Sequence, residues 1–81
     1  MNPERSDLNK ALAGEPLTER ELECLLGAAE GEEMSDTARR LFLSRHTVQS
    51  YRKKLLAKLD ARTIAHAVAL AYHTGLLRPR A

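Results

Sequence analysis

The segment SRHTVQSYRKKLLAKL, residues 44–59, contains five of the thirteen Lys and Arg residues of the chain and none of its eleven Asp and Glu residues. Cationic side chains at this density attract polyanions, and the Gln, Ser and His side chains among them can hydrogen-bond to base edges. An ordinary solvated helix would tolerate acids here and would often pair opposite charges four residues apart. The residue types therefore indicate a nucleic-acid-binding surface, with a merely soluble basic helix as the alternative.

A helix of about 3.6 residues per turn divides this segment into an apolar side and a polar side. The apolar side, predicted to face the core, holds Val48, Tyr51, Leu55 and Leu59. The opposite side holds His46, Gln49, Ser50, Lys53 and Ala57. Amide, hydroxyl, imidazole and ammonium groups are those that bind base edges, Gln favouring adenine and Lys guanine. The predicted base contacts are therefore Gln49, Ser50, Lys53 and His46.

The edges of the same helix are suited to phosphates. Lys54 and Lys58 flank the polar side on one edge, with Arg52 and Leu56 on the other. The N-terminal N–H groups of a helix also bind anions, and Arg45 and Thr47 lie beside them. The predicted phosphate contacts are Arg45, Thr47, Lys54 and Lys58.

Composition sets the fold class and the compartment. A chain of 81 residues, 4% of them aromatic and rich in Leu, Ala, Glu and Arg, predicts one small all-α domain. The single cysteine, Cys24, allows no intramolecular disulfide, and there is no signal peptide or long apolar run. These features predict a cytoplasmic protein, associated with the nucleoid when bound to DNA.

Charge is distributed very unevenly along the chain. Residues 1–36 carry ten acids and three bases, a net charge of −7, whereas residues 37–81 carry one acid and ten bases, a net charge of +9. Such asymmetry favours a polyanionic partner for the second half even though the whole chain has a net charge of only +2.

Local capping signals predict four helices. Thr18 and Glu21 form a capping box before the first, which Gly31 is placed to end. Ser35 is the predicted N-cap of a short second helix ending near Leu41, with Ala38 and Leu41 facing inward.

After a tight LFLS connection, Ser44 is the predicted N-cap of the basic helix and Asp60 its end. A fourth helix is expected over residues 63–74, with Gly75 closing it and Leu76 packing back on it. A short helix, a tight turn and a basic helix are typical of a helix-turn-helix.

Three motifs, LTERELECLLGAAEG, LS..TV..Y...LLAKL and AHAVALAYHTGLL, resemble the LuxR/NarL/FixJ-type, GerE-like helix-turn-helix domain of bacterial transcription regulators. The resemblance covers residues 17–77 without a gap. It implies a four-helix bundle in which the positions of Gln49, Ser50 and Lys53 approach bases. It also implies dimerisation through the last helix.

Departures from the family pattern concern the target sequence more than the fold. Gln49 replaces a usual Lys, Tyr51 a usual His, Lys54 a usual Asn and Leu55 a usual Ile; Thr37 and Ile64 also replace a usual Ile and Arg. The exchange at position 49 removes a charge and supplies an amide, which prefers adenine to guanine.

Boundaries follow from the resemblance. We expect a mobile leader over residues 1–16, the helix-turn-helix DNA-binding domain over 17–77 and a basic tail over 78–81. The short leader after Met1 resembles stand-alone members of the family, and excision from a longer regulator is the alternative.

The fourth helix has two apolar stripes. One, with Ala67 and Ala71, serves the core; the other is the predicted dimer interface, consisting of Ala65, Ala69 and Tyr72. The alternative is an Ala-rich exposed surface that only favours helix formation.

Other side chains offer less chemistry. Cys24 is predicted to be a buried small apolar residue, and His66 and His73 are predicted to be solvated or interfacial rather than metal ligands. The acids Glu30, Glu32 and Glu33 are interpreted as solvated. Leu22 and Leu26 are predicted to form an outward pair, covered by Leu8 and Leu12 or by a polymerase subunit.

Taken together, these patterns predict a DNA-binding transcriptional regulator that acts as a homodimer on double-stranded DNA, without enzymatic activity, cofactor or metal. The alternative is a protein-interaction module that pairs with a full-length regulator or RNA polymerase and recognises no promoter itself.

Overall fold

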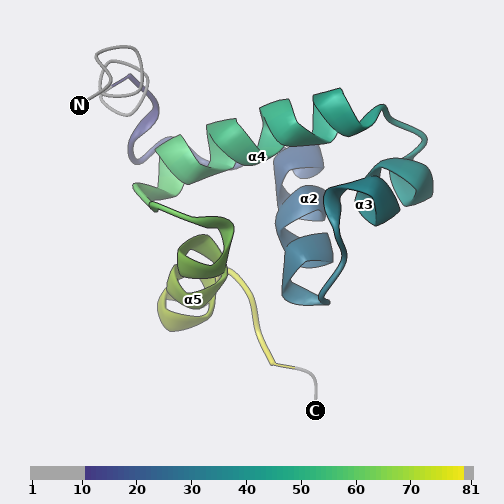
Figure 1. Ribbon diagram of the computed structural model, residues 1–81. Helices are drawn as coiled ribbons and strands as arrows, with labels where there is room; N and C mark the ends of the chain where they lie inside the picture. The colour runs from purple at the N-terminus through teal and green to yellow at the C-terminus, as the bar shows by residue number, and fades with distance from the viewer. Residues whose placement is uncertain (1–10, 80–81) are drawn as a thin grey trace.

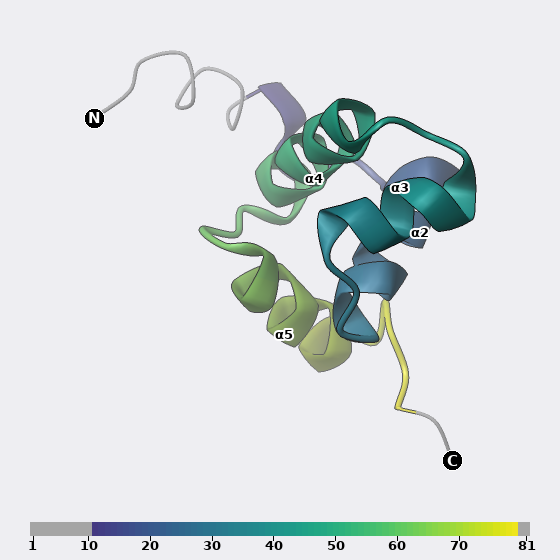
Figure 2. The same ribbon diagram turned by 45° about the vertical axis from the view of Figure 1, so that its right-hand side comes forward.

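A computed structural model describes residues 11–79, which form four α-helices and no strand within that range. The helices are α2 (Glu19–Ala29), α3 (Met34–Leu41), α4 (Arg45–Leu59) and α5 (Ile64–Thr74). Helix α2 contacts the other three, α4 lies across it, and α3 and α5 lie on either side without touching one another (Figures 1 and 2). The predicted all-α class is confirmed.

The helix boundaries follow from side-chain caps. Thr18 Oγ1 accepts from the N–H of Glu21 at 3.2 Å, and Glu21 Oε1 accepts from the N–H of Thr18 at 2.9 Å, which confirms the capping box. Ser44 caps α4 by accepting from the N–H of Thr47 at 3.0 Å, and Thr63 caps α5 in the same way. These hydroxyls satisfy N–H groups that have no partner inside the helix.

The predicted N-cap of α3 is wrong. Helix α3 begins at Met34 after Glu33, so Ser35 lies inside the first turn. The side chain of Asp36 accepts a 3.0 Å hydrogen bond from the N–H of Glu33, and this bond fixes a start that lies before the one a Ser35 cap would give. The predicted end at Leu41 is correct.

Two of the helix ends use residues other than glycine in the left-handed conformation. Phe42 follows α3 with φ 58° and Asp60 follows α4 with φ 52°, whereas Gly75 closes α5 with φ 84°. An Asp tolerates this conformation better than a bulky Phe does. After Gly75 it is Leu77, not Leu76 as predicted, that returns to the core; Leu76 is exposed.

The core lies where α2 meets the other three helices and is built from small and aliphatic side chains. Its buried members are Cys24, Leu25, Ala38, Leu41, Val48, Leu55, Ala61, Ala67, Ala71 and Leu77. Tyr51 and Leu59 pack against it, so the predicted apolar side of α4 is confirmed. Cys24 is fully buried, as predicted, and burial raises the pKa of its thiol.

Between residues 11 and 79 we find no helix long and apolar enough to cross a membrane.

Candidate nucleic-acid interface

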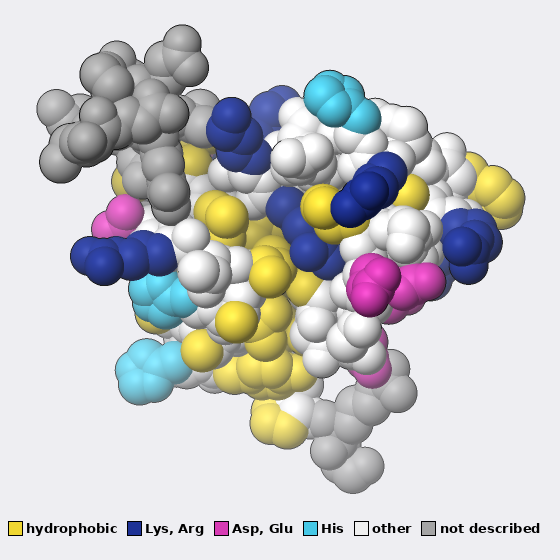
Figure 3. All heavy atoms as spheres, in the orientation of Figure 1, with side chains coloured by type: hydrophobic (Ala, Val, Ile, Leu, Met, Phe, Trp, Pro, Cys, Tyr) yellow, Lys and Arg dark blue, Asp and Glu magenta, His cyan; other side chains and the backbone are white. Residues whose placement is uncertain are grey.

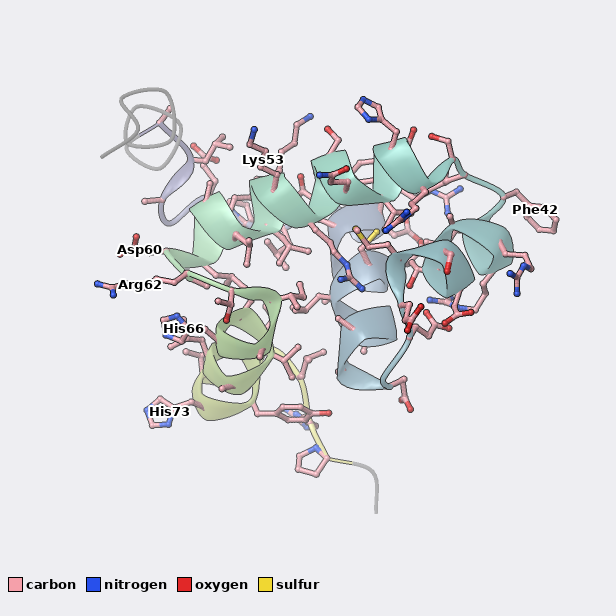
Figure 4. The ribbon with its side chains drawn as sticks, viewed as in Figure 1. Phe42, Lys53, Asp60, Arg62, His66 and His73 are labelled. Atoms are coloured by element: carbon pink, nitrogen blue, oxygen red, sulfur yellow. The ribbon has the colours of Figure 1, made fainter. Side chains whose placement is uncertain are left out.

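The outward face of α4 gathers four polar side chains that no part of the domain covers. We call His46, Gln49, Ser50 and Lys53 the reading face; all four are exposed, and none makes a hydrogen bond or ion pair with another described residue. Lys53 points away from the body of the domain in Figure 4. Helix α4 contains no acid, so a ligand with negative charge meets no repulsion along this face.

The predicted phosphate contacts divide between exposed and engaged side chains. Arg45 and Lys54 are exposed and, among the described residues, unpaired. The hydroxyl of Thr47 is half-buried and lies 2.8 Å from Ser44 Oγ. Arg52, on the other edge of the helix, was not among the predicted contacts; its side chain turns inward and donates to the carbonyl oxygen of Glu32 at 3.3 Å.

Lys58 lies inside the domain rather than on its surface. Its Nζ donates to Glu21 Oε1 at 2.6 Å and to the carbonyl oxygen of Pro16 at 3.1 Å, and its side chain is only 10% exposed. Two of the three ammonium donors thus bond inside the domain, which gives no support to the predicted phosphate contact of Lys58. A helical wheel cannot reveal this pairing, because the partner lies 37 residues away in sequence.

Glu21 is the acidic partner of Lys58 in a buried ion pair. Burial raises the pKa of its carboxyl, but the hydrogen bond and charge of Lys58 and the bonds from Thr18 outweigh burial and leave the pKa below its ordinary value of 4.5. The carboxylate therefore stays charged and joins the start of α2 to the end of α4.

Ala57 was expected on the polar side of α4, but it is buried. Leu55 lies on the opposite side of the same helix and is buried too. The C-terminal part of α4 is thus enclosed on two sides. Part of the enclosure comes from the segment before α2, because the N–H of Gly14 donates to the carbonyl oxygen of Lys58 at 3.0 Å.

A polar network holds α3 against the connection that follows α2. Glu32 accepts from Arg40 Nε and Nη2 at 2.8 and 2.9 Å and from the buried Thr37 hydroxyl at 2.8 Å. These bonds lower the pKa of the Glu32 carboxyl. A side chain at Gly27 would collide with Glu32 Oε1 and Thr37 Oγ1, so a larger residue here would have to displace this network. Glu32 is therefore a structural residue, and the interpretation of it as a solvated acid is wrong.

The sequence offered one signal for this network, the Thr37 that replaces a usual apolar residue. A hydroxyl at a helix position facing the core needs a hydrogen-bond partner, and the nearby acids were the available ones.

Helix α5 has the predicted two-sided character. Ala67 and Ala71 are buried, while Ala65, Ala69 and Tyr72 are exposed. His66 accepts from the N–H of Arg62 at 3.1 Å, and the described residues contain no group of three or more potential metal ligands. Whether the exposed stripe binds a second chain stays a prediction.

The prediction that Leu22 and Leu26 both face outward is correct for Leu26 only. Leu26 is 43% exposed, whereas Leu22 packs against the core. Leu8 lies outside the described residues, and so do residues 1–10 of the predicted mobile leader and residues 80–81 of the predicted tail.

The basic side chains of α4 lie on a helix without acids, whereas those of α2 and α3 lie beside acids, in the pairs Arg20–Glu23, Arg39–Asp36 and Arg40–Glu32. In Figure 3, Lys, Arg and His side chains lie along the upper edge, where α4 runs, and several acidic side chains gather below it on the side of α3. This separation repeats in space the charge asymmetry of the sequence.

Comparison with known proteins gives the class. A family model described as "Bacterial regulatory proteins, luxR family" matches residues 15–71. The chain therefore belongs to this family, and the predicted resemblance is confirmed.

Individual relatives carry names of the same kind. The chain is 38% identical over 64 residues to the uncharacterized transcriptional regulatory protein YxjL of Bacillus subtilis, covering 79% of this chain and 29% of that protein. It is 38% identical over 60 residues to the response regulator RamR of Streptomyces coelicolor, covering 74% of this chain and 30% of that protein. The chain thus spans less than a third of the length of these relatives.

Proposed function

We propose that this protein is a sequence-specific DNA-binding regulator of transcription that places α4 in the major groove and pairs with a second copy through α5. The observation that supports this most directly is the reading face, four exposed polar side chains without internal partners on a helix without acids. The family match and the printed names of the relatives support the same class of function.

Base recognition falls to the reading face. Gln49 supplies an amide that binds adenine through two hydrogen bonds, Lys53 favours guanine, and Ser50 and His46 accept or donate single bonds. Gln49→Ala should weaken binding to the preferred sequence by about 1 to 3 kcal/mol and relax the preference at one position per half-site. The measurement is a titration with the duplex recovered from a random DNA pool. Equal losses on that duplex and on random DNA would exclude this role for Gln49.

Phosphate contact falls to Arg45, Thr47, Lys54 and the N-terminal N–H groups of α4, without Lys58. Lys54→Ala should weaken binding to all sequences alike and make the dependence of log K on log salt shallower by about one unit. Because Lys54 is exposed, this change should leave the fold intact. It therefore serves as the matched control for Gln49→Ala.

Pairing through α5 would set two copies of α4 about one helical turn of DNA apart. Ala65 and Ala69 are small enough to let two helices approach closely, with Tyr72 beside them. Ala69→Glu should yield monomers in sedimentation and weaken binding to a duplex with two half-sites. Ser35→Glu, at an exposed site on α3, should change neither. Monomeric wild-type protein, free and on that duplex, would exclude the dimer.

A titration of wild-type protein with random duplex at low salt separates this proposal from a protein-interaction module. A regulator of this kind should bind with a steep salt dependence. Absence of binding would favour pairing with another regulator or with RNA polymerase instead.

A further inference from the structure

Phe42 is the most exposed large apolar side chain among residues 11–79. Its ring is 95% exposed in the turn between α3 and α4 and projects past the N-terminal end of α4, away from the body of the domain (Figure 4). The core gains nothing from it. Folding therefore does not explain why an aromatic residue stands there.

The backbone conformation at position 42 makes a phenylalanine there still less favourable. Phe42 has φ 58°, a left-handed conformation in which glycine would carry no steric penalty. The other non-glycine residue of this kind, Asp60, belongs to a type that tolerates the conformation. Backbone strain of this sort is concentrated at functional sites. A bulky residue that is both strained and exposed points to a role outside the folded domain.

Its surroundings indicate what it meets. Arg39 precedes the ring by three residues, with an 80% exposed side chain that has only a 3.9 Å contact to Asp36. Arg45 follows it by three residues and is exposed and unpaired among the described residues. In Figure 3, Lys or Arg side chains lie beside a hydrophobic group at this edge of the molecule. Two cationic side chains, Arg39 and Arg45, on either side of an apolar ring are complementary to two phosphates on either side of a sugar in a nucleic-acid strand.

We infer that Phe42 packs its ring on a deoxyribose of the DNA strand that borders the groove holding α4, between phosphates bound by Arg39 and Arg45. This inference rests on the proposed function. In helix-turn-helix complexes the N-terminal residues of the recognition helix approach the bases, so the preceding turn lies beside the backbone. Phe has no hydrogen-bonding group, and the sugar is the apolar part of that backbone. Phe42 then adds affinity without reading sequence.

Phe42→Gly tests the contact. It removes the ring and relieves the left-handed strain, so the urea midpoint of unfolding should stay the same or rise. Binding to a selected duplex and to a random duplex should weaken alike, by about fivefold for a ring half covered by the sugar. The slope of log K against log salt should not change, since no charge is lost. Leu26→Ala, a matched apolar truncation at an exposed site on α2, should leave binding unaltered.

Phe42→Trp supplies an independent readout, because the chain contains no other tryptophan. Its emission should change when random duplex is added. Unaltered binding by Phe42→Gly, or emission that is indifferent to DNA, would overturn the contact while leaving the proposed function in place. A wild-type chain that binds no duplex would overturn both.

Discussion

The two ends of α4 differ in nearly every physical respect. Toward the N-terminus, the reading face is exposed and makes no bonds to the described residues. Toward the C-terminus, Ala57 is buried, and Lys58 donates hydrogen bonds to Glu21 and Pro16. We call Ala57 and Lys58 the anchored end. The contrast teaches that one helix combines a polar surface open to solvent with an end that is fixed to the rest of the domain. A rigid support keeps side chains in position to recognise a ligand at low entropic cost.

Breaking the anchored end should have the largest effect. Lys58→Met leaves the buried Glu21 carboxylate without its cationic partner and should lower the free energy of unfolding by about 3 kcal/mol. Urea unfolding measures the loss. Lys54→Met, the matched change at an exposed lysine of the same helix, should stay within about 0.5 kcal/mol of wild type. Equal stability of the two variants would show that the buried pair does not support α4.

Enlarging small side chains should sharpen the contrast. Ala57 and Ser50 lie on the same side of a helical wheel, but only Ala57 is buried. Ala57→Leu should cost about 1 to 3 kcal/mol through overpacking. Ser50→Leu should leave the unfolding midpoint almost unchanged while weakening DNA binding. If both variants unfold alike, the enclosure of Ala57 is incorrect.

The reading face also has a support of its own, the Ser44 cap. Ser44→Ala removes the acceptor of the 3.0 Å bond from the N–H of Thr47 and should destabilise the domain by about 1 kcal/mol. Ser44→Asp, which keeps a capping oxygen, should restore most of that stability. A loss as large as that of Lys58→Met would show that the two ends of α4 do not differ in their contribution to folding.

The smallest expected effect is in the pH dependence. Because the pKa of the Glu21 carboxyl is lowered in the folded state, its contribution is complete above the ordinary value of 4.5 and disappears as pH falls below it. Wild-type stability should therefore decline in acid more steeply than that of Glu21→Gln. Parallel declines, measured by thermal unfolding at several pH values, would contradict a charged Glu21 in the folded protein.

Features that depend on neighbouring residues could be predicted from the sequence. The caps at Thr18 and Ser44 and the helix end at Gly75 are local signals, and they located the starts of α2 and α4 and the end of α5. The prediction for the start of α3 failed because several polar residues near it could act as the N-cap. The hydrogen bond that the Asp36 side chain accepts from the N–H of Glu33 determines which of them does.

Features that depend on distant residues could not be predicted. The partners of Lys58 are Glu21, in α2, and Pro16, in the segment before α2, and the N–H of Gly14 reaches the end of α4 from that same segment; periodicity within α4 contains no information about them. Exposure of the reading face was predictable because its four residues, which share one side of α4, are all polar. Phe42 was missed because an apolar residue in a tight connection suggests burial, and only the backbone conformation of the turn directs it outward.

The ion pair between Glu21 and Lys58 has a consequence for protein synthesis. Its partners are 37 residues apart, and a 15-residue helix such as α4 is only marginally stable alone in water. A nascent chain therefore cannot fix α4 until Lys58 has left the ribosome and reached the start of α2. The proposed DNA-binding surface on α4 is thus a product of completed folding, so a chain that ends before Lys58 should carry most of the basic segment without a fixed reading face.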